Sequence, residues 1–191
     1  MNILTIIPIA CSQIVNKDVL ISFFNQSIQS GLQIVTNDRC FVGMEDMPKR
    51  LNNCVYARNL CLDLMKKYLE FDTFDAFVML DSDCIIQDSI SIELMYKFLQ
   101  TNKDFVGVAL NKAPTGYTVG LEDSHIPQGC IMLTREFFDL DIKFRYVLGG
   151  VCECSNFTQD IRSKGKRYGY LDNKKRLIDL HSDSTKTTRN I

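Results

Sequence analysis

The sequence has no excess of charge of either sign. Its 22 lysine and arginine residues nearly balance its 23 aspartate and glutamate residues, which leaves a formal net charge of −1. The dense basic stretch from Lys164 to Arg176 is typical of a solvated turn and strand edge, because charge runs usually lie on surfaces. We therefore expect no nucleic acid or other general polyanion as a partner.

Long hydrophobic runs are also missing. The apolar stretch from Ile3 to Cys11 is short, contains Pro8 and follows no basic residue. We therefore expect no signal peptide at this position. No apolar stretch in the sequence is long enough to cross a bilayer, so we expect no transmembrane segment.

The eight cysteines do not show the paired Cys-x-x-Cys spacing of structural zinc sites. Cys152-Glu153-Cys154 together with a histidine is only a weak zinc signal. Most of the cysteines lie inside apolar patterns, where a free thiol packs as a small hydrophobic group. This usage is typical of a reducing compartment, so the predicted location is cytoplasmic.

The composition, with 46% hydrophobic and 24% charged residues, is that of an ordinary globular protein. A chain of 191 residues favours one domain, which we place at 1–183 with a polar tail at 184–191. Alternating strand and helix patterns predict an α/β domain with a mainly parallel sheet. Strands are predicted over 3–9, 32–35, 76–80, 105–110, 129–133, 167–170 and 176–181, and helices over 17–30, 53–69, 88–100, 135–138 and 156–164.

Two aspartates follow the apolar strand predicted over 76–80. Asp81 and Asp83 are two positions apart, a spacing that sends both carboxylates to the same face of an extended backbone. Open α/β sheets bind ligands at the carboxyl ends of their strands. Two oxygen ligands there suit Mg²⁺ or Mn²⁺. The alternative is a pair of turn carboxylates, although two adjacent charges beside a buried strand are costly without a cation.

An apolar strand that ends in Asp81-Ser82-Asp83, after a helix that contains Ala57-Arg58-Asn59, resembles the GT-A glycosyltransferases, particularly their family-2-like branch. The resemblance covers Ile3 to about Asp183. It implies a small single-domain GT-A fold, a Rossmann-like nucleotide-sugar-binding domain with a mainly parallel mixed sheet. It also implies Mn²⁺ or Mg²⁺, a UDP- or GDP-sugar donor, and a glycan, protein or lipid acceptor that the sequence does not identify.

The resemblance assigns roles to individual positions. It implies a metal site of Asp81, Asp83 and His181. It implies donor-binding positions at Pro8, Ile9, Ala10, Asn37, Asp38, Arg58 and Ser82. On the acceptor side it suggests His125, Gln128 and Gly129, although a histidine in such a loop more often has no such role. The planar guanidinium of Arg58 suits pairing with Asp81 or with a phosphate, and the alternative is a surface arginine on a helix.

Glu153-Cys154 has the position of the family's Glu-Asp element, which supplies the general base in inverting members. Glu153 matches the first acid, and a carboxylate can take a proton from an acceptor hydroxyl within hydrogen-bond reach. Cys154 replaces the second acid, and a thiol is mostly neutral at its ordinary pKa. The base and the stereochemistry therefore stay open, and the alternative function is a catalytically impaired nucleotide-sugar-binding protein.

Two other enzyme classes fit the sequence less well. Phosphatases of the Asp-x-Asp type carry their motif after the first strand, whereas here the motif lies in the middle of the chain. Sugar nucleotidyltransferases have a glycine-rich loop near the N-terminus, and Pro8-Ile9-Ala10-Cys11 contains no glycine.

Overall fold

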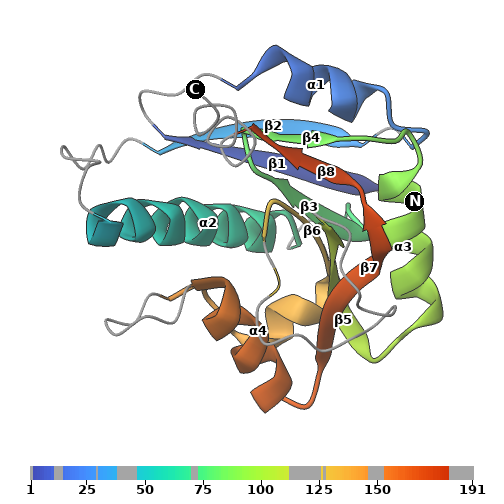
Figure 1. The fold of residues 1–191 in the computed structure, drawn as a ribbon. Coiled ribbons are helices and arrows are strands. Elements are labelled where there is room, and N and C mark those ends of the chain that lie inside the picture. The colour runs from blue at the N-terminus through green and yellow to red at the C-terminus, as the bar shows by residue number, and fades with distance from the viewer. Residues whose placement is uncertain are drawn as a thin grey trace.

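A computed structural model describes residues 2–10, 15–28, 30–37, 47–69, 73–111, 126, 128–145 and 153–180 (Figure 1). The strands in these ranges are β1 (Ile3–Ala10), β2 (Gly31–Asn37), β3 (Ala76–Leu80), β4 (Cys84–Ile86), β5 (Phe105–Asn111), β6 (Cys130–Thr134), β7 (Arg167–Lys175) and β8 (Leu177–Asp179). The helices are α1 (Lys17–Phe24), α2 (Met47–Leu69), α3 (Ser91–Thr101), the 3₁₀ helix η1 (Arg135–Leu140) and α4 (Glu153–Ser163).

The strands of the described residues form a six-stranded sheet, in the order β2-β1-β3-β6-β5-β7, and a separate ribbon of β4 and β8. The sheet pairs β1 in parallel with β2 and β3, and β5 in parallel with β7. Strand β6 runs antiparallel to both of its neighbours, β3 and β5. The α/β class with a mainly parallel mixed sheet, predicted from the sequence, is confirmed.

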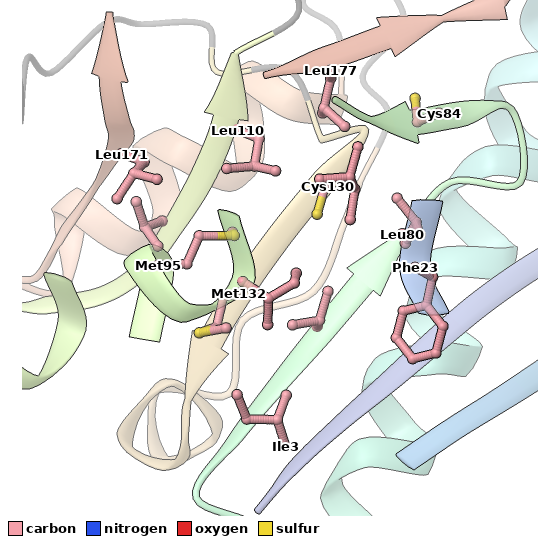
Figure 2. Packing of buried hydrophobic residues seen from close by; sticks show 14 of the residues in the cluster. Ile3, Phe23, Leu80, Cys84, Met95, Leu110, Cys130, Met132, Leu171 and Leu177 are labelled. Atoms are coloured by element: carbon pink, nitrogen blue, oxygen red, sulfur yellow. The ribbon is translucent and has the colours of Figure 1, made fainter. Parts of the chain in front are cut away.

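Helices cover both faces of the sheet, and this explains why β3 is apolar at every position. Ala76, Val78 and Leu80 point into a core shared with α1 and α3. Phe77 and Met79 point into a second core shared with α2, η1 and α4. The alternation follows from the two-residue period of a strand. Figure 2 shows the first core, in which residues of the sheet meet Cys84 of β4 and Leu177 of β8.

The two largest differences from the predicted helices are at the end of α1 and the start of α2. Helix α1 ends at Phe24 rather than near residue 30. The Gln26 side chain turns back there and donates hydrogen bonds to the Ser22 and Asp88 carbonyls, at 3.0 and 2.8 Å. Helix α2 begins at Met47, so the predicted start at Asn53 is wrong. A tertiary contact ends the first helix early, and the polar first turns of the second concealed its start.

The ribbon of β4 and β8 was not predicted as a unit. Cys84 pairs with Asp179 in an antiparallel register. The next backbone bond runs from the Leu180 amide to the Asp83 carbonyl, over 3.0 Å. The ribbon therefore brings the end of β8 directly beside the acidic pair that follows β3. Within the described residues, no helix is long and apolar enough to cross a membrane.

Candidate active site

The acidic pair lies in a tight turn between β3 and β4. The Asp81 amide donates to the Gly129 carbonyl at 2.9 Å, and the Cys84 amide donates to the Asp81 carbonyl at 3.1 Å. Both aspartates are half-buried. The ligand atoms of Asp81, Asp83 and Cys84 lie within 4.8 Å of one another. Two carboxylate oxygens and a sulfur at this spacing fit a divalent cation.

Cys84 is a member of this group that the sequence analysis missed. Its thiol is buried and donates to Asp83 Oδ1 at 3.7 Å. Figure 2 places it where β4 meets the first core. A cysteine in an apolar run looks like a core residue in the sequence, and only the turn before β4 brings its sulfur to the acidic pair. A sulfur ligand is softer than a carboxylate and suits divalent transition metals better than Mg²⁺.

Arg58 joins the acidic pair to a second acid. It lies on α2 and is only 8% exposed, so it is not a surface arginine. Its Nη2 donates to Asp81 Oδ2 and its Nη1 donates to Glu153 Oε1, each at 2.9 Å. The two carboxylates come from the end of β3 and the start of α4, 72 positions apart in the chain. The planar guanidinium bridges them with one charge.

Aromatic and amide groups fix the plane of this guanidinium. The carbon Cζ of Arg58 lies over the Phe144 ring, 5.6 Å from its centroid. That ring stacks on Phe157 of α4 with centroids 4.1 Å apart. The Asn59 side chain holds the backbone of Phe144 through two hydrogen bonds, of 2.9 and 2.8 Å. Asn59, the neighbour of Arg58 on α2, therefore positions the ring on which the guanidinium rests.

The two carboxylate oxygens of Glu153 differ in their hydrogen bonds. Oε1 accepts from Arg58 at 2.9 Å and from the Cys154 thiol at 3.8 Å. Oε2 is buried and has no hydrogen-bond partner among the residues that the structure describes. The residue opens α4, where the helix dipole favours a negative charge. An unpartnered buried carboxylate oxygen is destabilising, and such atoms are expected where a ligand supplies the missing bond.

The groups packed around Arg58 and Asp81 stay neutral. Burial raises the pKa of Cys61 on α2 to about 12, with a further contribution from Asp81 that Arg58 partly offsets. Burial, followed by Asp81, also raises the pKa of Cys130 at the start of β6. Burial raises the pKa of Tyr168 well above its usual value. The charged groups described above therefore lie in a surrounding of neutral thiols and a neutral phenol.

Gln128 and Gly129, expected on the acceptor side, directly precede β6. Gln128 is buried, accepts from the Tyr168 hydroxyl at 2.9 Å and donates to the Ile126 carbonyl at 2.6 Å. Its side chain is thus part of a buried network. Gly129 offers its carbonyl to the amide of Asp81. The structure therefore attaches the start of β6 directly to the acidic turn.

The strand and turn positions expected to bind the donor lie, where the structure describes them, at the same edge of the sheet. Ile6 of β1 pairs with Met79 of β3, so Pro8 and Ile9 lie beyond the point at which β3 ends. Ala10, the last residue of β1, pairs with Asn37, the last residue of β2. Ser82 lies in the acidic turn, and its carbonyl accepts from the Asn16 amide at 3.5 Å. Asp38, His125 and His181 lie outside the described residues.

No protein-family model matches the chain, and no curated protein sequence matches it. Among solved structures it is similar to A197 from STIV, with 19% identity and a TM-score of 0.56 over 91% of this chain and 83% of that chain. A mannosyltransferase from Pyrobaculum calidifontis in complex with GDP-Man and Mn²⁺ has 12% identity and a TM-score of 0.64. That match covers 93% of this chain and 56% of the mannosyltransferase.

A third similar structure is Drosophila β1,4-galactosyltransferase 7 with manganese, UDP-Gal and xylobiose, at 14% identity and a TM-score of 0.57. The match covers 97% of this chain and 73% of that chain. The protein has the GT-A fold. This confirms the fold predicted from the Asp81-Ser82-Asp83 turn and from the helix that contains Ala57-Arg58-Asn59. At these identities the likeness is one of fold, and the GT-A domain here spans little more than half of the mannosyltransferase.

Proposed function

We propose that this GT-A protein is a metal-dependent glycosyltransferase of the hexosyltransferase kind. It would move a sugar from a UDP- or GDP-sugar to a hydroxyl group of a glycan, protein or lipid acceptor. The observation that carries the proposal is the bridge from Asp81 through Arg58 to Glu153. It unites an acidic turn suited to a cation with a buried carboxylate that keeps one oxygen open.

The cation site is proposed at Asp81, Asp83 and His181, with Cys84 as an additional donor. The hydrogen bond from the Leu180 amide to the Asp83 carbonyl supports His181, because it holds the preceding residue beside the acidic turn. A Mn²⁺ or Mg²⁺ ion in this site would neutralise the donor diphosphate and so help the nucleotide diphosphate to leave.

The nucleotide half of the donor is proposed to lie along the carboxyl ends of β1 and β2. This edge carries Pro8, Ile9, Ala10, Asn37 and, directly after β2, Asp38. Ser82 lies between the two acids of the turn and would face the diphosphate. The placement follows the general rule that open α/β sheets bind ligands at the carboxyl ends of their strands.

Glu153 is proposed as the residue that receives the acceptor proton. Arg58 holds Oε1, so the carboxylate cannot rotate freely, while Oε2 has no partner and can accept from a hydroxyl group. The Cys154 thiol, in place of a second acid, donates a weak bond to Oε1 and does not compete for the proton. In an inverting reaction Oε2 takes the proton, and in a retaining reaction it orients the acceptor.

The acceptor would approach from the side of Gln128, Gly129 and His125. Gly129 is bonded to the acidic turn, so this segment borders the proposed reaction centre. The four described cysteines are buried, as expected of thiols that pack as small hydrophobic groups, and the proposed location is a reducing cytoplasm.

A donor screen tests the function. Purified protein is incubated with UDP- and GDP-sugars and Mn²⁺, and release of the nucleotide diphosphate is measured. We expect slow donor hydrolysis that Asp83→Ala abolishes and that Glu153→Gln lowers by about 10²- to 10⁴-fold. The matched control is Asp160→Asn, which alters a half-buried acid of α4 that is paired with Arg145.

The outcomes separate the readings. If the wild type binds no donor, the proposal is wrong. Donor binding without any release of nucleotide diphosphate would instead favour an inactive nucleotide-sugar-binding protein, the reading that Cys154 raises. Full turnover in Glu153→Gln would remove the role of Glu153 alone.

A further inference from the structure

The guanidinium of Arg58 binds two carboxylates at once. One of its nitrogens holds an acid of the acidic turn, and the other holds the acid that opens α4. The side chains of Arg58, Asp81 and Glu153 are 10%, 18% and 9% exposed, so water screens this chain of charges only weakly. A change of charge at one end is therefore felt at the other end.

We propose that Arg58 is a positioning residue that couples cation binding at Asp81 and Asp83 to the charge of Glu153. The inference rests on the proposed cation site and adds a dependence that the resemblance does not imply. Glu153, which is assigned to the acceptor proton, contributes through Arg58 to the affinity for the metal.

The charges of the site give the direction of the coupling. Three carboxylates and one guanidinium carry a net charge of −2, which balances one divalent cation. Replacing Glu153 by glutamine leaves a net charge of −1. It also weakens the hold on Nη1, so the guanidinium turns more fully toward Asp81 and competes with the cation. Both effects lower the affinity for the cation.

The geometry requires an arginine at this position. The two carboxylates accept from different nitrogens of one planar fork, at equal distances of 2.9 Å. The plane rests on the Phe144 ring, which Asn59 and Phe157 hold in place. A lysine would keep the charge but has no such fork, so it would hold one carboxylate at a time.

Mn²⁺ binding to the full chain, without donor, tests the coupling. The dissociation constant is measured by electron paramagnetic resonance for the wild type, Glu153→Gln, Arg58→Met, Arg58→Lys and the double variants. We expect Glu153→Gln to weaken Mn²⁺ binding about tenfold, a Coulomb effect of the lost charge and the released guanidinium. Asp160→Asn is the matched control, because Asp160 also lies on α4 and also pairs with an arginine, Arg145. It should bind as the wild type does.

The double variants show whether the effect passes through Arg58. In the Arg58→Met or Arg58→Lys background, adding Glu153→Gln should change the dissociation constant by less than about threefold, because coupled residues are not additive. The inference is overturned if Glu153→Gln binds Mn²⁺ like the wild type. It is also overturned if Glu153→Gln changes the dissociation constant by the same factor with Arg58 present as in the Arg58 variants. If Arg58→Met does not fold, Arg58→Lys supplies the comparison.

The result is independent of turnover. Coupled Mn²⁺ binding without donor hydrolysis would support this inference and contradict the proposed function. Donor turnover together with uncoupled Mn²⁺ binding would support the proposed function and contradict this inference. A wild type that binds no Mn²⁺ overturns the inference together with the proposed cation site.

Discussion

The described residues contain two buried arginines, Arg58 and Arg176, and each lies between two carboxylates. Arg176 uses Nε and Nη2 on Asp172 and Nη1 on Asp88. All four carboxylate oxygens of Asp88 and Asp172 accept hydrogen bonds. At Arg58, by contrast, Glu153 Oε2 has no partner within the described part of the chain. We call the group of Arg176, Asp88 and Asp172 the closed cluster, because all its carboxylate oxygens are bonded. We call the group of Arg58, Asp81 and Glu153 the open cluster, because Oε2 of Glu153 is not.

The two clusters also differ in what they hold together. The Arg176 backbone accepts from the Gln87 amide and donates to the Asn111 carbonyl, each at 2.9 Å. Asp88 in turn accepts hydrogen bonds from the Ile90 amide and the Ser91 hydroxyl at the start of α3. The closed cluster therefore fastens the ribbon to the sheet and to α3, and the open cluster faces the end of the sheet that carries the proposed site. We infer that the first stabilises the fold and the second is kept for a ligand.

The largest expected effect is on the closed cluster. Arg176→Met should lower the free energy of unfolding by about 3 kcal/mol, because two carboxylates lose their shared partner. Urea unfolding followed by circular dichroism measures the change. Mn²⁺ affinity of the folded fraction should stay within about threefold of the wild type, since Arg176 pairs with neither acid of the turn. An unchanged unfolding free energy would contradict the structural role.

A smaller effect is expected from the thiol beside the open cluster. Burial raises the pKa of Cys61 from 9.0 to about 12, so the folded protein keeps a proton that the unfolded chain loses. The stabilisation is complete below pH 9.0 and declines as the pH rises toward 12. Between about pH 8 and about pH 10, the wild type should lose about 1.4 kcal/mol more stability than Cys61→Ala.

Unfolding curves of both proteins at these pH values measure the difference. Equal losses in the wild type and Cys61→Ala would show that Cys61 ionises with an ordinary pKa in the folded protein.

The smallest expected effect is on the stability of the open cluster. Glu153→Gln should change the free energy of unfolding by less than about 1 kcal/mol, because the removed charge has an oxygen without a partner and Arg58 keeps Asp81. Thermal and urea unfolding measure it, with Asp160→Asn as control. A loss as large as that expected for Arg176→Met would make the two clusters alike and remove the contrast.

The sequence predicted best what depends on local pattern. The strand at 76–80 was placed correctly, because a continuous apolar run must be buried on both faces. The acidic turn that follows it was identified by spacing alone. The mainly parallel sheet followed from the alternation of strands and helices, and the short helix after residue 134 was also recognised.

What the sequence did not predict depends on distant partners. Strand β4 is three residues long and exists because β8 pairs with it from more than ninety positions away. The closed cluster of Arg176 joins Asp88 and Asp172, and the basic stretch around it looked like a solvated edge. The open oxygen of Glu153 could not be predicted either, since an unmet hydrogen bond is a property of the packed site.

The bond between the Leu180 amide and the Asp83 carbonyl also has a consequence for synthesis on the ribosome. Asp81 and Arg58 are close in the chain and can meet early, and Glu153 can join them when α4 emerges. Strand β8, which pairs with β4, emerges last, so the contacts of the ribbon that hold the acidic turn form last. A nascent chain would thus contain Arg58, Asp81 and Glu153 before the strand that pairs with β4 has been made.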